Sequence, residues 1–164
     1  MEPITYTLQS IPSGKAGIRL TLKIMGKLVK DYRHTRAIRE LALKLTENLQ
    51  QKNFYGEAQA LHHFVKERIR YVKDVKNVET LQSPFQTLRL KAGDCDDKSI
   101  LVASLLESIG HPTRFIAVGF TPNSLSHVFV QTKIGNKWVS VECTEPVPLG
   151  WTPKNIKNMM THNN

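Results

Sequence analysis

One stretch constrains the fold more than any other: AGDCDDKSILVASLLESIG, residues 92–110. Asp94 is a favourable helix N-cap, and Gly110 is a favourable residue for ending a helix. Between them, the apolar positions up to Ile109 occupy more than one side of a helix. A helix that is apolar on several sides must be buried. The sequence therefore predicts a buried central helix that starts at a cysteine flanked by aspartates.

Helices are predicted before this stretch and strands after it. Helical periodicity predicts amphipathic helices over residues 15–32, from Thr35 and from near Gly56. Residues 73–93 are expected to be a connection, and a short helix is expected after Pro153. Segments rich in β-branched and aromatic residues predict strands over 113–120, 127–134 and 137–144. This order predicts an α+β domain in which the buried helix packs on a small antiparallel sheet.

Cys95 would be the first or second residue of the buried helix. Backbone N–H groups there carry partial positive charge, which stabilises a thiolate and the oxyanion of a tetrahedral intermediate. Asp94, Asp96 and Asp97 act against a thiolate, so a reactive Cys95 needs a histidine partner. Two alternatives stay open, a cysteine that only packs and calcium binding by the three aspartates. Their spacing is not that of an EF-hand.

The predicted hairpin around Gly135-Asn136 supplies a candidate partner for Cys95. A two-residue loop pairs Phe129 with Glu142, so His127 and Glu142 lie on one face as diagonal neighbours. Such neighbours have Cα atoms about 7–8 Å apart, a distance that a glutamate can bridge. Glu142 would then fix the tautomer of the His127 ring, whose other nitrogen faces the thiol. A three-residue loop would put Glu142 on the wrong face.

The remaining cysteine and histidines are weaker candidates. The same register puts Cys143 on the face opposite His127, so we expect it to be a packed strand cysteine with no disulfide to Cys95. His34, His62, His63, His111 and His162 have no carboxylate partner predicted by the pattern. No zinc site is predicted, because no Cys/His set has zinc spacing.

Residues 55–146 resemble the transglutaminase-like superfamily of cysteine enzymes. The resemblance rests on IRYV, VETLQSPFQTL, AGDCDD, SIGHPTRFIAVG, HVFV and KWVSVECT, in that order. It implies that Cys95 is the nucleophile, His127 the general base and acid, and Glu142 the orienting carboxylate. The likeness is greater to small bacterial and bacteriophage members than to the large animal crosslinking enzymes. It implies a papain-like Cys-His-Asp/Glu triad acting through a thioester on a protein or peptide substrate, with no cofactor or metal.

Two residues depart from the family pattern. Glu142 stands where the family usually has aspartate, which moves the carboxylate by about an ångström at a place where small displacements matter. Asp96 replaces an aromatic residue that is frequent after the cysteine.

The expected activity is hydrolysis, as in a protease or amidase. The alternatives are protein crosslinking by acyl transfer and a non-catalytic interaction or phage assembly protein. Gln82 or Gln86 could also donate to an oxyanion.

Charge divides the chain in two. Residues 1–73 hold 14 Lys/Arg and 6 Asp/Glu, whereas residues 74–164 hold 9 and 8. We expect an N-terminal arm and basic helices packed on the core (1–54), a transglutaminase-like catalytic core (55–146) and a C-terminal tail (147–164). The basic helices could bind an acidic protein or nucleic acid, or could simply be solvated.

With no signal peptide or membrane span recognised, the expected location is the cytoplasm of a bacterium or of a phage-infected cell. The oligomeric state is left open.

Overall fold

Five helices and six strands make up the computed structural model, which describes residues 9–75 and 79–164. The elements are α1 (Gly14–Tyr32), α2 (Arg36–Thr46), α3 (Phe54–Arg68), β1 (Arg70–Tyr71), α4 (Pro84–Leu90), β2 (Ala92–Gly93), α5 (Cys95–Ser108), β3 (Thr113–Gly119), β4 (His127–Ile134), β5 (Lys137–Val141) and β6 (Asn158–Asn163). This is the predicted α+β class. Within the described ranges, no helix is both long enough and apolar enough to cross a membrane.

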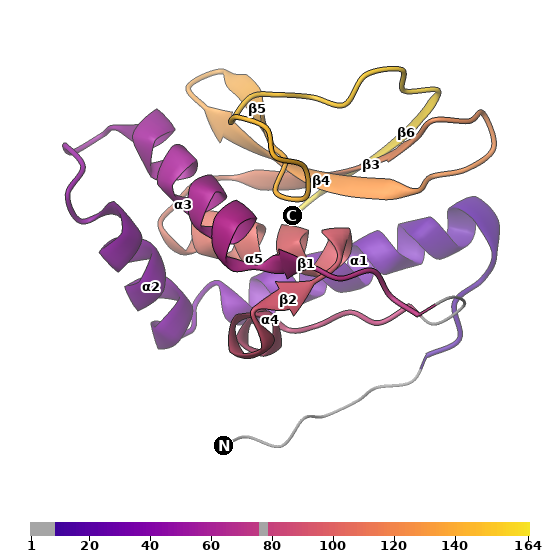
Figure 1. Ribbon diagram of the computed structural model, residues 1–164, viewed down its shortest axis with the longest axis horizontal. Coiled ribbons are helices and arrows are strands. Elements are labelled where there is room, and N and C mark those ends of the chain that lie inside the picture. Colours follow the sequence, from indigo (N-terminus) through magenta and orange to yellow (C-terminus); the bar gives the residue numbers. More distant parts are fainter. Residues whose placement is uncertain (1–8, 76–78) are drawn as a thin grey trace.

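Helix α5 is the centre of the core, as its sequence predicts. Its side chains from Asp97 to Leu106 are buried, and α1, α2, α3 and α4 all contact it. It also packs on β3 and β4 (Figure 1). Apolar residues of α1, including Met25 and Val29, complete this core. The basic helix α1 is therefore a structural part of the domain. The division of the chain at residues 54 and 146 stays a prediction.

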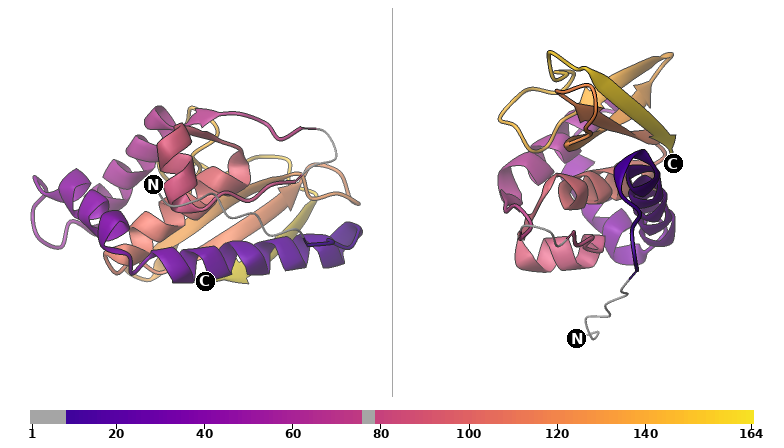
Figure 2. Two further views of the ribbon diagram at one scale, coloured as in Figure 1. Left: turned by 90° about the horizontal axis from the view of Figure 1, so that it is seen from below. Right: turned by 90° about the vertical axis from the view of Figure 1, so that its right-hand side faces the viewer.

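The main sheet has the strand order β5-β4-β3-β6, and every neighbouring pair is antiparallel. The helices lie on one of its faces (Figure 2). Ile116, Val118 and Phe129 form a smaller apolar cluster, which Ile156 of the segment after β5 helps to cover. Ile134 pairs with Lys137 and Val130 with Val141, which is the register predicted from the two-residue loop.

The secondary structure predicted for two segments was wrong. Residues 84–90 form a helix, although QTLRL alternates partly like a strand, because Ser83 caps it and Pro84 suits its first turn. The segment after Pro153 forms the strand β6 instead of a helix, because the exposed edge of β3 pairs with it from Arg114 to Gly119. Residues 1–8, the start of the expected N-terminal arm, lie outside the described residues.

Candidate active site

The start of α5 is held by reciprocal hydrogen bonds. The Asp94 carboxylate accepts from the backbone N–H of Asp96 at 2.9 Å and of Asp97 at 3.1 Å. The Asp97 carboxylate accepts in turn from the N–H of Asp94 at 3.2 Å. This capping box fixes Asp94 as the N-cap and Cys95 as the first helical residue, as predicted. The N–H of Cys95 itself is not used in this set of bonds.

His127 and Glu142 are hydrogen-bonded partners. His127 begins β4, Glu142 follows β5, and their Nε2 and Oε2 atoms lie 2.5 Å apart. Glu142 is only 1% exposed, and its other carboxylate oxygen accepts from the Thr144 N–H at 2.8 Å. An ionised carboxylate can only accept, so Nε2 of His127 carries the proton in this pair. In a neutral ring, Nδ1 is then the free acceptor, which a general base for a thiol requires.

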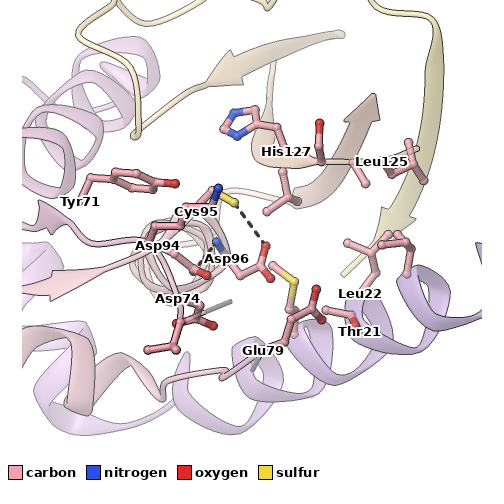
Figure 3. Close-up of a pocket in the computed structure, with 17 residues that line it drawn as sticks. Thr21, Leu22, Tyr71, Asp74, Glu79, Asp94, Cys95, Asp96, Leu125 and His127 are labelled. Carbon is pink, nitrogen blue, oxygen red and sulfur yellow. Dashed lines mark hydrogen bonds between the residues drawn. The ribbon is translucent and has the colours of Figure 1, made fainter. Parts of the chain in front are cut away.

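Cys95 and His127 line the same cavity, which has a volume of about 340 Å³. The close-up in Figure 3 shows them with Tyr71 on one side of the cavity and with the aspartates at the start of α5. Tyr71 belongs to β1, which pairs with β2 and so lies beside the residues that precede Cys95. Tyr71 was not predicted as a site residue, although it belongs to the IRYV motif.

The surroundings of Cys95 favour the neutral thiol. Burial raises the pKa of Cys95, and the charges of Asp96 and Asp94 raise it further, whereas the backbone N–H of Val128 acts in the opposite direction. The thiol donates to the Asp96 carboxylate, with sulfur and oxygen 3.6 Å apart. Burial and the charges of Asp94, Asp97 and Glu79 raise the pKa of Asp96 to about 7. The conflict between aspartates and thiolate that the sequence predicted is therefore present.

Other candidates lie apart from this cavity. Cys143 is buried in the main apolar core, and both cysteines are free, as expected. Neither Gln82 nor Gln86 is among the residues that line the cavity. Instead, the N–H of Gln82 donates to the Asp97 carboxylate at 2.8 Å, so Gln82 supports the start of α5.

The expectation that no other histidine has a carboxylate partner was wrong. His111 lies 2.6 Å from the Glu57 carboxylate, because the chain after α5 returns beside the start of α3. His111 lies just beyond the C-terminal end of α5, whereas Cys95 is at the N-terminal end, so this pair does not compete with His127. His62 of α3 is also buried, and its Nε2 donates to the backbone carbonyl of Glu142 at 2.6 Å. It thereby anchors the segment that presents Glu142.

The described residues contain one cluster with the spacing of metal ligands. Ligand atoms of Asp94, Cys95 and Asp96 all lie within 4.8 Å of one another. Calcium takes six to eight oxygen ligands, whereas this set offers two carboxylates and a thiol. The Asp97 carboxylate is bound by the N–H groups of Gln82 and Asp94 instead. The calcium alternative stays a prediction.

A comparison with protein-family models identifies the superfamily of the chain. The family model of the transglutaminase-like superfamily matches residues 39–143, and the chain therefore belongs to this superfamily. The match begins inside α2, earlier than the resemblance of residues 55–146 suggested. No curated protein matches the chain.

Solved structures share this fold. A protein from Cytophaga hutchinsonii, described as a proposed cysteine protease, has a TM-score of 0.58 and 20% identity over 86% of this chain and 52% of its own. A proposed protease from Parabacteroides distasonis has a TM-score of 0.61 and 14% identity over 78% of this chain and 26% of its own. Calcium-bound LapG from Legionella pneumophila has a TM-score of 0.57 and 20% identity over 83% of this chain and 80% of its own. The chain thus spans about half and about a quarter of the first two proteins.

Proposed function

We propose that the protein is a cysteine hydrolase that cleaves peptide or amide bonds, with Cys95, His127 and Glu142 as its triad. The observation that carries the proposal is the hydrogen bond between Nε2 of His127 and Oε2 of the buried Glu142. His127 and Cys95 both line the cavity beside this pair. Membership of the superfamily and the fold shared with proposed proteases support it. The substrate is then a protein or peptide.

The reaction divides into acylation and deacylation. In acylation, Nδ1 of His127 takes the thiol proton as the Cys95 sulfur attacks the carbonyl carbon. The imidazolium, stabilised by Glu142, returns this proton to the leaving amine, and the C–N bond breaks to leave a thioester. In deacylation, His127 removes a proton from water, which attacks the thioester and releases a carboxylic acid and the thiol. The N–H of Cys95 and the hydroxyl of Tyr71 are the candidate oxyanion donors.

The raised pKa of Cys95 gives His127 a specific role. A thiol that is protonated at rest must lose its proton during the attack, so His127 acts as a general base in the acylation step. The thiol then reacts only as fast as His127 can remove its proton.

Two other functions are second candidates. The same thioester gives protein crosslinking if a lysine amine replaces water. A non-catalytic interaction or phage assembly protein is the other candidate, favoured by the aspartates that oppose the Cys95 thiolate. In that case the basic residues of α1 and α2 would bind an acidic protein or nucleic acid. The bacteriophage setting and the cytoplasmic location stay predictions from the sequence.

Hydrolysis of a peptide library in ¹⁸O-labelled water tests the proposal. The expected result is ¹⁸O in one oxygen of each new carboxyl terminus, with no product from Cys95→Ala. Methylamine added in excess separates the alternatives, because a crosslinking enzyme would form the N-methylamide in preference to the acid. If no peptide in the library gave either product, the non-catalytic alternative would be favoured.

A further inference from the structure

The cavity beside Cys95 concentrates negative charge in a chain of net charge +9. Four carboxylates line it, those of Asp74, Glu79, Asp94 and Asp96, and Lys73 is the one Lys or Arg among its described lining residues. They come from two segments, the connection after β1 and the start of α5 (Figure 3). Burial raises the pKa values of Asp94 and Asp96, and the negative charges of neighbouring carboxylates, which repel one another, raise them further. A cation in the cavity would remove this repulsion.

An unpartnered hydroxyl lies in the same wall. Thr21 of α1 lines the cavity and is only 7% exposed. Its Oγ1 has no hydrogen-bond partner within the described part of the chain. A buried hydroxyl without a partner costs free energy, so it is expected to meet a polar group when the cavity is occupied. Figure 3 shows Thr21 beside Glu79, so this hydroxyl and a carboxylate face the same part of the cavity.

Apolar side chains make up much of the remaining wall. Ile18, Leu22 and Met25 of α1 lie on one side, and Leu125 comes from the loop before β4. A wall of this composition suits a ligand with an aliphatic stem and a charged end, which is the chemistry of lysine and arginine side chains. A bare metal ion would leave the apolar part without a function.

We propose that this cavity binds a lysine or arginine side chain of the substrate, next to the amide bond that Cys95 attacks. The methylene groups pack on Ile18 and Leu125, and the ammonium or guanidinium group lies among the carboxylates, where the Thr21 hydroxyl accepts a hydrogen bond from it. The inference rests on the proposed hydrolase function, since it names the substrate class of that same site.

A basic side chain bound in the cavity also changes the pKa of the Cys95 thiol. Burial raises the pKa of Cys95, and the negative charges of Asp96 and Asp94 raise it further, so a cation beside these carboxylates lowers it again. A basic substrate therefore helps to activate the thiol that attacks it, and a neutral peptide lacks this effect.

Peptide binding to Cys95→Ala protein tests the inference separately from catalysis. The probes are fluorescent hexapeptides of glycine, serine and alanine that contain one lysine, arginine, norleucine or citrulline, at physiological salt. Lysine and arginine peptides should bind about tenfold more tightly than norleucine and citrulline peptides, the effect of one partly buried charge pair. Asp96→Asn and Thr21→Val should each reduce this ratio by about threefold or more. Glu47→Gln, an equal charge change at an exposed carboxylate after α2, should leave it unchanged.

Equal affinities for the charged and neutral peptides would overturn the inference, as would an unchanged ratio in both cavity variants. The inference would also be overturned if micromolar Ca²⁺ displaced the lysine peptide and bound the Thr21→Val variant with the same affinity as the parent protein. The cavity would then be a metal site. Thr21→Val removes an unpartnered hydroxyl, so its thermal stability should not fall, which separates lost binding from unfolding. If basic peptides bind but no peptide is cleaved, the cavity inference stands and the hydrolase proposal fails.

Discussion

Asp96 lies next to the thiol of Cys95 and accepts its hydrogen bond, in a position where the family often has an aromatic residue. Its carboxylate is surrounded by Asp94, Asp97 and Glu79, whose charges add to the effect of burial on its pKa. The residue therefore costs stability when it is ionised and also opposes a thiolate. A side chain that is unfavourable in both respects is expected to have a function in the cavity.

The pH dependence of stability measures this cost. Unfolded aspartate titrates near 3.8, whereas Asp96 in the fold titrates at about 7, so between these values the folded state holds a proton that unfolding releases. Raising the pH from about 5 to about 7.5 therefore destabilises the wild type through Asp96. Asp96→Asn should lose less thermal stability over this range, measured by circular dichroism. The lowered pKa of His62 contributes with the opposite sign in both proteins, so equal slopes would contradict the account.

At the scale of single residues, sequence reasoning found the triad candidates but not the cavity. Alternation along the hairpin was enough to put His127 and Glu142 on one face, because strand geometry relates residues that are close in the chain. Thr21, Tyr71 and Glu79 approach Cys95 from separate segments. Only the packing of those segments brings them together, and no local pattern encodes it.

Among the elements, local signals determined which predictions were correct. The capping residues of α5 and the Gly135-Asn136 loop are strong local signals, and both elements lie where they were predicted. Helix α4 has only seven residues, too few for periodicity to show. Strand β6 (NMMTHN) has little β-branched character, and its pairing with β3 depends on an edge that the rest of the sheet creates.

Gly93→Ala tests how tightly the start of α5 is built. A Cβ atom at Gly93 would lie 2.6 Å from Cβ of Asp97 and 3.0 Å from its Oδ2, so Asp97 would have to move and weaken the capping box. We expect a loss of about 1–3 kcal/mol in the free energy of unfolding, the usual effect of an added methyl group in a packed site. Urea denaturation measures it. An unchanged denaturation midpoint would mean that Asp97 is not held as described.

For the whole molecule, the N-terminal helices are part of the domain and not an appendage. Buried residues of α1 pack on α5, and Arg33 at the end of α1 forms an ion pair with Glu107 of α5 at 2.7 Å. The family match begins only at residue 39, so α1 lies outside it. The α+β class and the central buried helix could be predicted from periodicity. Packing of the N-terminal helices on the core was also expected, but the elements that α1 contacts could not be predicted, because its amphipathic pattern fits any apolar partner.

Val29→Ala tests this place of α1. Val29 is fully buried, so we expect the variant to lose about 1–3 kcal/mol in the free energy of unfolding. The matched control is Lys23→Ala, at an exposed position of the same helix, which should change the value by no more than about 0.5 kcal/mol. A similar small effect in both variants would mean that α1 is only loosely attached.

The central claim is that His127 accepts the proton of Cys95, and the most direct test is alkylation of the two cysteines. Iodoacetamide labelling at about pH 7.5, resolved by peptide mass mapping, should modify Cys95 faster than the buried Cys143. Replacing His127 with alanine or Glu142 with glutamine should slow labelling of Cys95 by about tenfold or more, and leave Cys143 unchanged. Equally slow labelling of both cysteines, unaffected by either substitution, would contradict the coupled Cys95–His127–Glu142 site.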